Sequence, residues 1–238
     1  MGNLLSGNLF LERLPKAASE LLSDAGTLVD LKVREPLFDA GQRIEYVWFP
    51  LDGVISNVIT MASGAVVKVG VVGREGVAGY TASLTAGASA SSLYAQISGR
   101  ALKVSRADLL AAIEASGTEL FAAYTESQIA SLSWYAGCNR LHKTDQRFAR
   151  WLLMAHDRMP ADDIPLTQEF LALMLGVRRP GVTVAAMSLQ RRGIITYRRG
   201  RIAVLDRAAL LALACECYAS VERRFAGLLG YSIRKDSD

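Results

Sequence analysis

The fold is decided by residues 167–191, which read TQEFLALMLGVRRPGVTVAAMSLQR. Thr167 can cap a short amphipathic helix, and Gly176 ends that helix because glycine readily adopts the backbone of a tight turn. A second helix is predicted from about Arg179 to Arg191, with Pro180 tolerated in its first turn. A helix, a glycine turn and a second helix are typical of the helix-turn-helix that places its second helix in the major groove of DNA.

The second helix has one apolar and one polar side. Val182, Ala186 and Leu189 recur at helical spacing and are expected to face the core. The polar residues at the start of the helix then lie near its outward end, which is the part of a recognition helix that meets base edges. We therefore assign base reading to Arg178, Arg179 and Thr183.

A hairpin with a basic tip is predicted directly after this helix. Residues 194–197 and 202–205 are rich in β-branched side chains, and the four residues between them read RRGR. A turn so rich in arginine suits a DNA phosphate backbone better than it suits a buried site. We assign phosphate contact to Thr167 and Gln168 at the start of the first helix and to Arg198, Arg199 and Arg201 in the hairpin.

The charge of the chain is divided unevenly. Up to Cys138 there are 10 Lys and Arg against 13 Asp and Glu, whereas the rest of the chain has 17 against 10. The two parts therefore carry net charges of −3 and +7. Clustered positive charge favours a polyanion such as DNA as the partner of the C-terminal part, and the alternative interpretation is an ordinary solvated surface.

Residues 28–104 have the pattern of short strands, rich in Val and Ile and broken by Gly, Asp and Pro. Val67, Val69 and Val71 share one face of such a strand, while Lys68 points to the other. Several antiparallel strands at this spacing predict a compact barrel or roll. The expected hairpins join residues 54–60 to 66–71, and residues 93–97 to 102–104 around Ser98 and Gly99.

The pattern then changes to helices. Ser105 with Asp108, and Ser116 with Glu119, fit the capping pattern at the starts of two successive helices. The second helix, residues 118–138, has an apolar surface wider than one stripe. That surface can pack on the chain's own strands or pair with the same helix of a second subunit, and the pattern does not separate these two. Thr144 is expected to cap a further helix that ends at Met159 and Pro160, and residues 160–165 to form an acidic loop.

Over residues 9–205, the chain resembles the Crp/Fnr family of bacterial transcription regulators. The resemblance is carried by residues 139–142 (NRLH), residues 147–153 (RFARWLL) and residues 166–190, which begin with LTQE. It implies an α+β fold with an N-terminal antiparallel β-roll like that of cyclic-nucleotide-binding domains, a long dimerisation helix and a C-terminal winged helix-turn-helix. We place these three parts at residues 1–116, 117–138 and 139–238.

The resemblance also implies a function and partners. It implies a homodimer that reads an inverted-repeat operator in double-stranded DNA, with RNA polymerase as a further partner. In the family an Arg near the start of the recognition helix reads guanine, and Arg179 matches it. Pro180 and Val184 stand where a Glu and a second Arg often join it, so the operator cannot be copied from other members.

A competing interpretation is a ligand-binding module that controls a partner protein without binding DNA. The basic helix and hairpin argue against it. An enzyme with a basic phosphate site is a second competitor, but no nucleophile, base and orienting group form a catalytic arrangement in the sequence. We therefore expect a regulator without catalytic activity.

Family members that bind cyclic AMP use a Gly-Glu pair for the ribose and a later Arg for the cyclic phosphate. Gly79 and Tyr80 align with the pair, and Ala90 and Ser91 align with the Arg and the residue after it. Because a charge-assisted contact would be lost without the Arg, we expect a signal other than cyclic AMP and no cofactor. A shifted alignment brings in two further residues, so the candidate effector pocket is Arg74, Glu75, Gly79, Tyr80 and Ser91.

Metal chemistry finds little support in the sequence. Cys138, Cys215 and Cys217 are too few and too widely placed for an iron–sulfur cluster. On a predicted helix the thiols of Cys215 and Cys217 point to different faces, which favours core packing, and His142 and His156 lack the spacing of paired ligands. We therefore predict no metal.

The location of the protein is predicted from what the sequence contains. An odd number of cysteines favours the reducing cytoplasm. No segment is apolar enough for a membrane span, and the N-terminus lacks the pattern of a secretory signal. Met1, Gly2 and Ser6 fit the myristoylation pattern, for which a chance match is the better interpretation. We expect a cytoplasmic protein with no membrane partner.

Overall fold

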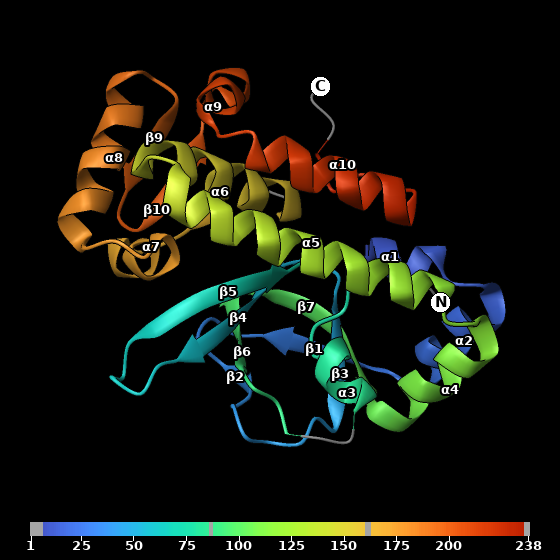
Figure 1. Ribbon diagram of the computed structural model, residues 1–238. Coiled ribbons are helices and arrows are strands. Elements are labelled where there is room, and N and C mark those ends of the chain that lie inside the picture. The colour runs from blue at the N-terminus through green and yellow to red at the C-terminus, as the bar shows by residue number, and fades with distance from the viewer. Residues whose placement is uncertain (1–6, 86–87, 160–162, 236–238) are drawn as a thin grey trace.

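The computed structural model describes residues 7–85, 88–159 and 163–235. A long helix, α5 (Glu119–Leu141), crosses the whole molecule (Figure 1). The N-terminal strands lie on one side of it, and the C-terminal helices lie on the other side and around its C-terminal end. The motif of Met1, Gly2 and Ser6 lies outside the described residues.

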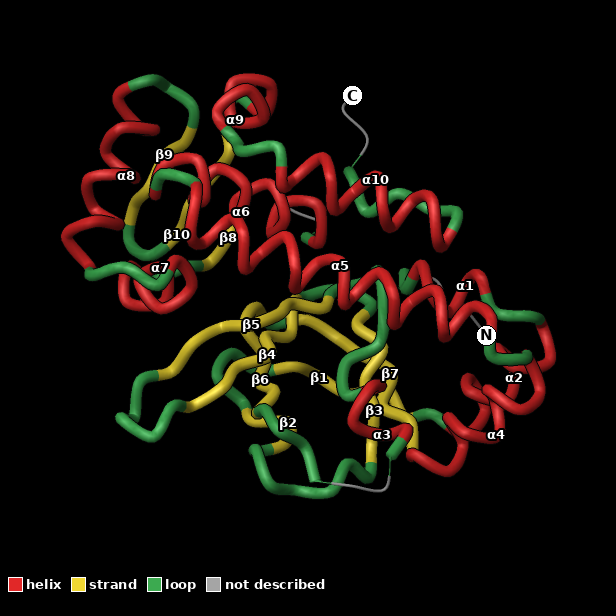
Figure 2. The backbone as a smooth tube through the Cα atoms, in the orientation of Figure 1, coloured by secondary structure: helices red, strands yellow, loops and turns green. Residues whose placement is uncertain are grey.

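The N-terminal part is an antiparallel roll of two sheets, as predicted. One sheet has the order β1-β7-β3 and the other the order β2-β6-β4-β5. Figure 2 shows these strands as one large group, separate from the small C-terminal sheet. The strands of the roll are β1 (Thr27–Leu31), β2 (Pro36–Phe38), β3 (Tyr46–Pro50), β4 (Val54–Thr60), β5 (Val66–Val72), β6 (Ser92–Ile97) and β7 (Gly99–Ser105).

One of the two predicted hairpins is present and the other is absent. β4 pairs with β5, with Thr60 opposite Val66, which confirms the first hairpin. The second is wrong, because β6 and β7 belong to different sheets and the chain passes from one sheet to the other at Ser98 and Gly99. A side chain at Gly99 would collide with the backbone oxygen of Asp52, so glycine is required where the chain crosses over.

The register of β5 with β4 shifts at Val69, so Val71 lies opposite Ser56 and Lys68 lies opposite Val58. The predicted alternation is therefore wrong at Val71, which shares the second face of β5 with Lys68. The ammonium group of Lys68 lies 5.6 Å from the ring centre of Trp151 and 3.1 Å from Oε1 of Gln96. Burial lowers the pKa of Lys68 well below its usual value, and the cations Arg158 and Arg150 lower it further. The second face of β5 is therefore turned toward the C-terminal helices.

Four helices accompany the roll: α1 (Leu9–Arg13), α2 (Lys16–Ala25), α3 (Tyr80–Leu84) and α4 (Arg106–Ser116). Ser105 caps α4 as predicted, since its hydroxyl accepts a hydrogen bond of 3.1 Å from the backbone N–H of Asp108. The predicted cap at Ser116 is wrong. Ser116 is the last residue of α4, its hydroxyl donates to the carbonyl of Ala112, and Thr118 stands at the start of α5.

Aromatic side chains join the roll to α5. The ring of Phe10 lies 5.1 Å from the rings of Phe121 and Tyr124 and 6.4 Å from that of Phe49, measured between ring centres. All four side chains are buried. Burial of a large apolar side chain stabilises the fold by roughly 1.5–3 kcal/mol, so this cluster fixes the N-terminal half of α5 on the roll.

The other face of α5 is apolar and partly uncovered. α10 packs along part of α5, and the Arg224 guanidinium pairs there with the Glu126 carboxylate. The helix continues to Leu141, beyond the predicted end at Cys138. The exposed apolar side chains of α5 are Ile129, Leu132, Trp134 and Leu141, with relative exposures of 59%, 43%, 40% and 76%.

The C-terminal part contains a helix-turn-helix and a three-stranded sheet of order β8-β10-β9. Lys143, rather than Thr144, stands at the N-terminal cap of α6. Part of the predicted acidic loop is strand β8, and residues 160–162 lie outside the described residues. The elements are α6 (Thr144–Arg158), β8 (Asp163–Pro165), α7 (Gln168–Leu175), α8 (Arg179–Arg191), β9 (Ile195–Arg198), β10 (Arg201–Val204), α9 (Arg207–Leu213) and α10 (Cys217–Leu229).

A buried ion pair joins the roll to α6. Nη2 of Arg158 lies 2.8 Å and its Nε 3.0 Å from Oε1 of Glu75, and both side chains are almost completely buried. The Tyr231 hydroxyl also donates a hydrogen bond of 2.6 Å to the Glu75 carbonyl. Because breaking a buried pair leaves one charge unpaired, this contact holds the two parts of the molecule in a defined arrangement.

Among the described residues, no single helix has the length and apolar composition needed to cross a membrane. α7 and α8 have the required length and apolar composition only when they are taken together, and the chain bends by 102° between them.

Candidate nucleic-acid interface

α7 and α8 form the predicted helix-turn-helix. Gly176 adopts the left-handed conformation with φ of 60°, and its backbone N–H bonds to the last turn of α7. Val182, Ala186 and Leu189 are buried, which confirms the predicted inner face of α8. The Arg147 guanidinium of α6 donates to the carbonyl of Leu175, so the end of α7 is also tied to the neighbouring helix.

The residues assigned to base reading lie together at the start of α8. Arg178 stands at the N-terminal cap, Arg179 is the first helical residue, and both are exposed. The Thr183 hydroxyl donates a hydrogen bond of 3.2 Å to the Arg179 carbonyl. The Arg179 guanidinium lies 2.9 Å from a carboxylate oxygen of Glu169 on α7, and both side chains are more than 60% exposed. An exposed pair of this kind is weak, so Arg179 can exchange Glu169 for another acceptor.

The hairpin β9–β10 has the predicted basic tip. Arg199 and Gly200 have φ of 49° and 74°, the left-handed conformations that a two-residue hairpin turn requires. Arg198 and Arg199 are exposed. Arg201 is exposed as well, but its Nε lies 2.6 Å from a carboxylate oxygen of Asp163 on β8. Arg201 therefore has an acceptor of its own, which a phosphate would have to replace.

The residues assigned to phosphate contact come from two segments that meet. The backbone N–H of Leu166 donates a hydrogen bond of 2.6 Å to the carbonyl of Gly200 at the hairpin tip. Thr167 follows directly and caps α7 by accepting a hydrogen bond of 3.3 Å from the N–H of Phe170. Gln168 is exposed in the first turn. The start of α7 and the arginines of the hairpin thus form one basic surface.

The residues assigned to the effector pocket do not share one cavity. A cavity of about 130 Å³ lies between the roll and α5, and Gly79, Tyr80 and Ser91 line it. Arg74 and Glu75 are not among its lining residues, and the Glu75 carboxylate is occupied by its buried ion pair. The structure therefore separates the two residues of the shifted alignment from the other three.

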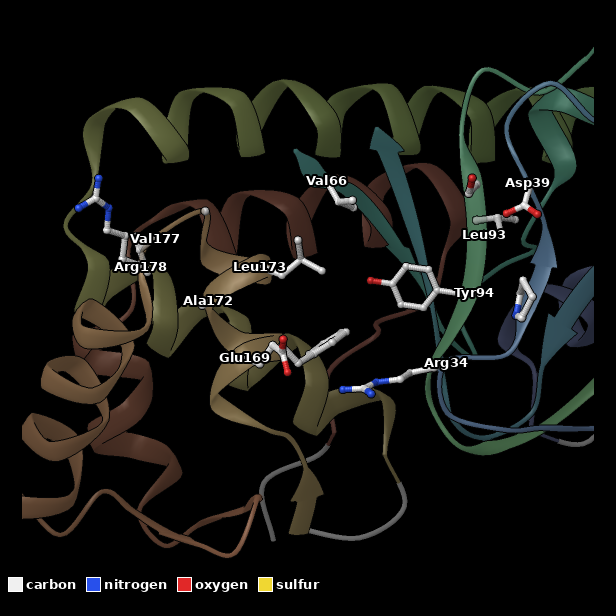
Figure 3. A pocket seen from close by; sticks show the side chains of 14 residues that line it. Arg34, Asp39, Val66, Leu93, Tyr94, Glu169, Ala172, Leu173, Val177 and Arg178 are labelled. Carbon is white, nitrogen blue, oxygen red and sulfur yellow. The ribbon is translucent and has the colours of Figure 1, made fainter. Parts of the chain in front are cut away.

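A second cavity, of about 830 Å³, lies between the roll and α7 (Figure 3). The ring of Tyr94 points into it and meets the ring of Phe170 edge-on, with 6.5 Å between ring centres. Arg34 and Glu169 lie at its border from opposite sides. Since Glu169 also pairs with Arg179, this cavity adjoins the N-terminal end of α8.

Four residues whose proximity was not predicted from the sequence lie together beside the C-terminal end of α5. The donor atoms of Cys138, His142, Cys215 and Cys217 all lie within 4.8 Å of one another. The predicted helix across Cys215 and Cys217 is wrong, because Cys215 lies between α9 and α10 and Cys217 is the first residue of α10. The missed signal is the spacing of Cys138 and His142, one helical turn apart at the end of α5.

The cysteine thiols are buried and interact with each other. The pKa of Cys138 is lowered to about 5. The hydrogen bond with Cys215 is the main cause, the nearby cation Arg150 also lowers the pKa, and burial opposes both effects. The pKa values of Cys215 and Cys217 are raised, chiefly by the contact with Cys138 and by burial respectively. Among the three, Cys138 is therefore the one that ionises first.

Comparison with known proteins identifies the C-terminal part. Residues 146–213 match the family model of the Crp-like helix-turn-helix domain, which includes α7, α8 and the hairpin. No curated protein matches the chain.

Solved structures share the fold of most of the chain. FixK2 from Bradyrhizobium japonicum is 20% identical and superposes with a TM-score of 0.61 over 80% of this chain and 98% of its own. A CRP-family transcriptional regulator from Thermus thermophilus is 18% identical, with a TM-score of 0.63 over 78% and 96%. A Crp/Fnr regulator from Eubacterium rectale is 18% identical, with a TM-score of 0.61 over 85% and 95%.

Proposed function

Because the chain carries a Crp-like helix-turn-helix domain within the fold of Crp/Fnr regulators, we propose that it is a transcription regulator that binds a specific sequence of duplex DNA. One observation carries the proposal. The start of α8 presents Arg178 and Arg179 to solvent, and the hairpin tip, which carries three further arginines, contacts the segment at the start of α7. We assign base reading to the helix and phosphate contact to the hairpin and the start of α7.

A homodimer follows from the exposed apolar face of α5. Ile129, Leu132 and Trp134 are 40% or more exposed although they lie in the middle of a long helix. Ile129 and Leu132, three residues apart, share one side of α5, and Trp134 lies about 140° around the helix from Ile129. Large exposed apolar side chains of this kind mark an interaction site, and a second copy of the same helix offers a matching surface. Two-fold pairing would place two α8 helices on an inverted repeat, with half-sites about one helical turn apart.

The signal to this regulator is, in our proposal, not cyclic AMP. The cavity between the roll and α5 has a volume of about 130 Å³, below the roughly 300–1,000 Å³ of typical small-molecule sites. None of the described residues that line it is charged, so a cyclic phosphate would find no cation among them. Neutral polar groups such as Asn57, Thr125 and Gln128 remain.

The cavity between the roll and α7 offers a route from a signal to the DNA-reading residues. It is lined by residues of the roll, such as Arg34 and Tyr94, and by Glu169 on α7. A change in the separation of the roll and α7 would move Glu169 and so alter how firmly it holds Arg179. This gives the roll a physical means to bias DNA binding.

The remaining parts of the proposal concern location and partners. Three free cysteines fit a reducing compartment, and we place the protein in the cytoplasm. RNA polymerase is the partner that a transcription regulator of this fold would meet at its operator. We assign the chain no catalytic activity.

The proposal is tested by selecting DNA from a random pool with the purified protein, with and without cell metabolites, and sequencing what is retained. We expect enrichment of an inverted repeat. Retention of DNA without any sequence preference, or no retention at low salt, would contradict the proposal and favour a module that acts on a protein partner.

A further inference from the structure

The meeting point of α5 and α10 has the composition and size of a metal site. Cys138 lies in the last turns of α5, and His142 caps that helix. Cys215 lies just before α10, and Cys217 is the first residue of α10. The three thiols are buried and the imidazole is half-buried. Three sulfurs and one imidazole nitrogen are a donor set that proteins use for zinc.

The distances fit one tetrahedral ion. Bonds of about 2.3 Å to sulfur and 2.0–2.1 Å to nitrogen separate two sulfurs by about 3.8 Å, and a sulfur from a nitrogen by about 3.5 Å. The observed separations are 3.5 Å between the sulfurs of Cys138 and Cys215, and 3.6 Å between Sγ of Cys217 and Nδ1 of His142. Because all four donors lie within 4.8 Å, the space suits one ion rather than a cluster.

The surroundings of His142 match those of a ligating histidine. Its Nε2 lies 3.0 and 3.2 Å from the two carboxylate oxygens of Glu216, while Nδ1 faces Cys217. A carboxylate on the far nitrogen of a ligating imidazole fixes the ring and its tautomer. Since a site with three thiolates and Zn²⁺ carries a net negative charge, the nearby cation Arg150 completes the charge balance.

An ion could reach the site from solvent. A cavity of about 300 Å³ opens beside it, lined by Trp134 and Leu141 of α5 and by Cys138, His142 and Cys217 themselves. An access route of this kind is one of the features that a metal site needs.

We propose that Cys138, His142, Cys215 and Cys217 bind one thiophilic ion of the Zn²⁺ type through three thiolates and Nδ1 of the imidazole. The ion would join two segments that are far apart in the sequence. It would fasten the C-terminal end of α5 to the start of α10, which packs on both α5 and α6. The site thus stabilises the junction from which the helix-turn-helix extends.

The test is metal uptake by the untagged, full-length protein, reduced and freed of metal, then titrated with Zn²⁺ or Co²⁺. We expect one ion per chain, the intense visible bands and thiolate charge-transfer absorption of tetrahedral Co²⁺, and protection of all three thiols from alkylation by Zn²⁺. A Co²⁺ spectrum of octahedral type, or thiols that react equally with and without Zn²⁺, would overturn the proposal.

Substitutions distinguish the residues that ligate the metal from residues that only lie beside the site. Cys215→Ser and His142→Gln should lose stoichiometric uptake, whereas Ser133→Ala, which changes the wall of the same cavity without removing a donor, should keep it. Glu216→Gln should keep the stoichiometry and weaken affinity about 10- to 100-fold, as expected for a residue that only orients the imidazole. If a cysteine variant fails to fold, the wild-type Co²⁺ spectrum and Glu216→Gln still decide the question. Unchanged affinity of both Glu216→Gln and His142→Gln would count against the site.

Discussion

Arg179 is held by Glu169 at 2.9 Å on a surface where both side chains are exposed, so its guanidinium is oriented without being buried. A guanidinium at the start of a recognition helix can donate two hydrogen bonds to guanine. Arg179→Ala should therefore cost roughly 1–3 kcal/mol of operator binding and relax the preference at one base pair per half-site. Binding to operators with single base changes measures both effects.

Arg178 provides the comparison for this prediction. It stands at the cap of α8, one residue before Arg179, and is the alternative base reader. If Arg179→Ala lowers affinity equally for every sequence while Arg178→Ala changes the base preference, the two roles are exchanged.

The arginines of the hairpin are expected to behave differently. Arg198→Ala and Arg199→Ala should each weaken specific and non-specific binding to a similar extent and lower the salt slope by about one, because each removes a phosphate contact. Arg201→Ala should have a smaller effect, since Arg201 is already paired with Asp163 at 2.6 Å. A series of affinities at increasing salt distinguishes these outcomes. A hairpin variant that altered base preference would contradict the assignment.

The sequence predicted the burial or exposure of residues for which the local segment alone decides it. The buried Val182, Ala186 and Leu189 and the exposed Arg179 follow from helical spacing within one stretch. The meeting of Cys138 with Cys215 depends on how α5 packs against α10, which no local pattern encodes. The pairing of Glu75 with Arg158 was missed for the same reason.

Among the elements, α5 carries the prediction about assembly. Ile129→Glu places a charge beside Leu132 on the exposed apolar side of the helix and should convert a dimer to a monomer, because an unpaired charge is costly in an apolar interface. Sedimentation at micromolar concentration measures the change, and operator binding should fall with it. Ala111→Glu on the exposed side of α4 is the matched control and should leave the dimer intact. A wild-type protein that binds its operator specifically as a monomer would contradict this account of α5.

α10 carries a prediction about pH. Burial raises the pKa of Glu222 to about 7 from 4.5, and its Oε2 has no hydrogen-bond partner among the described residues. The folded state therefore binds a proton that the unfolded state releases, and its stabilisation is complete below pH 4.5 and lost as pH rises through 7. The free energy of unfolding should fall by up to about 3 kcal/mol across this range.

Urea unfolding at several pH values checks this. Glu222→Gln, which keeps the shape of the side chain without the charge, should remove most of that dependence, and Glu114→Gln at an exposed position should leave it unchanged. The same pH dependence in the wild type and in Glu222→Gln would show that another group is responsible.

The elements also show where sequence patterns stop being informative. The hairpin of β4 and β5 was predicted because its two strands are neighbours in the sequence and in the sheet. β6 and β7 are equally close in the sequence, yet they pair with β2 and β4 in one sheet and with β1 and β3 in the other. The short segment between them looks like a turn in either case, so only the packing of the two sheets separates a hairpin from a crossover.

For the molecule as a whole, the arrangement of roll, α5 and winged helix predicts no response to cyclic AMP. The cavity between the roll and α5 is about 130 Å³ in volume, and none of its lining residues that the structure describes is charged. Calorimetry should show no saturable heat at physiological nucleotide concentrations. Tight binding of one nucleotide per chain would show that the roll opens into a larger, differently lined site, and would contradict this part of the account.

In the proposed function, the molecule reads DNA sequence through the start of α8. The most direct test is an anisotropy titration with the selected operator, with the same operator altered one base pair at a time, and with a scrambled duplex, all at one fixed salt concentration. We expect the operator to bind at least roughly 10³-fold more tightly than the scrambled duplex, and symmetric changes in the two half-sites to have equal effects. Equal affinity for the operator and the scrambled duplex would contradict the proposed function.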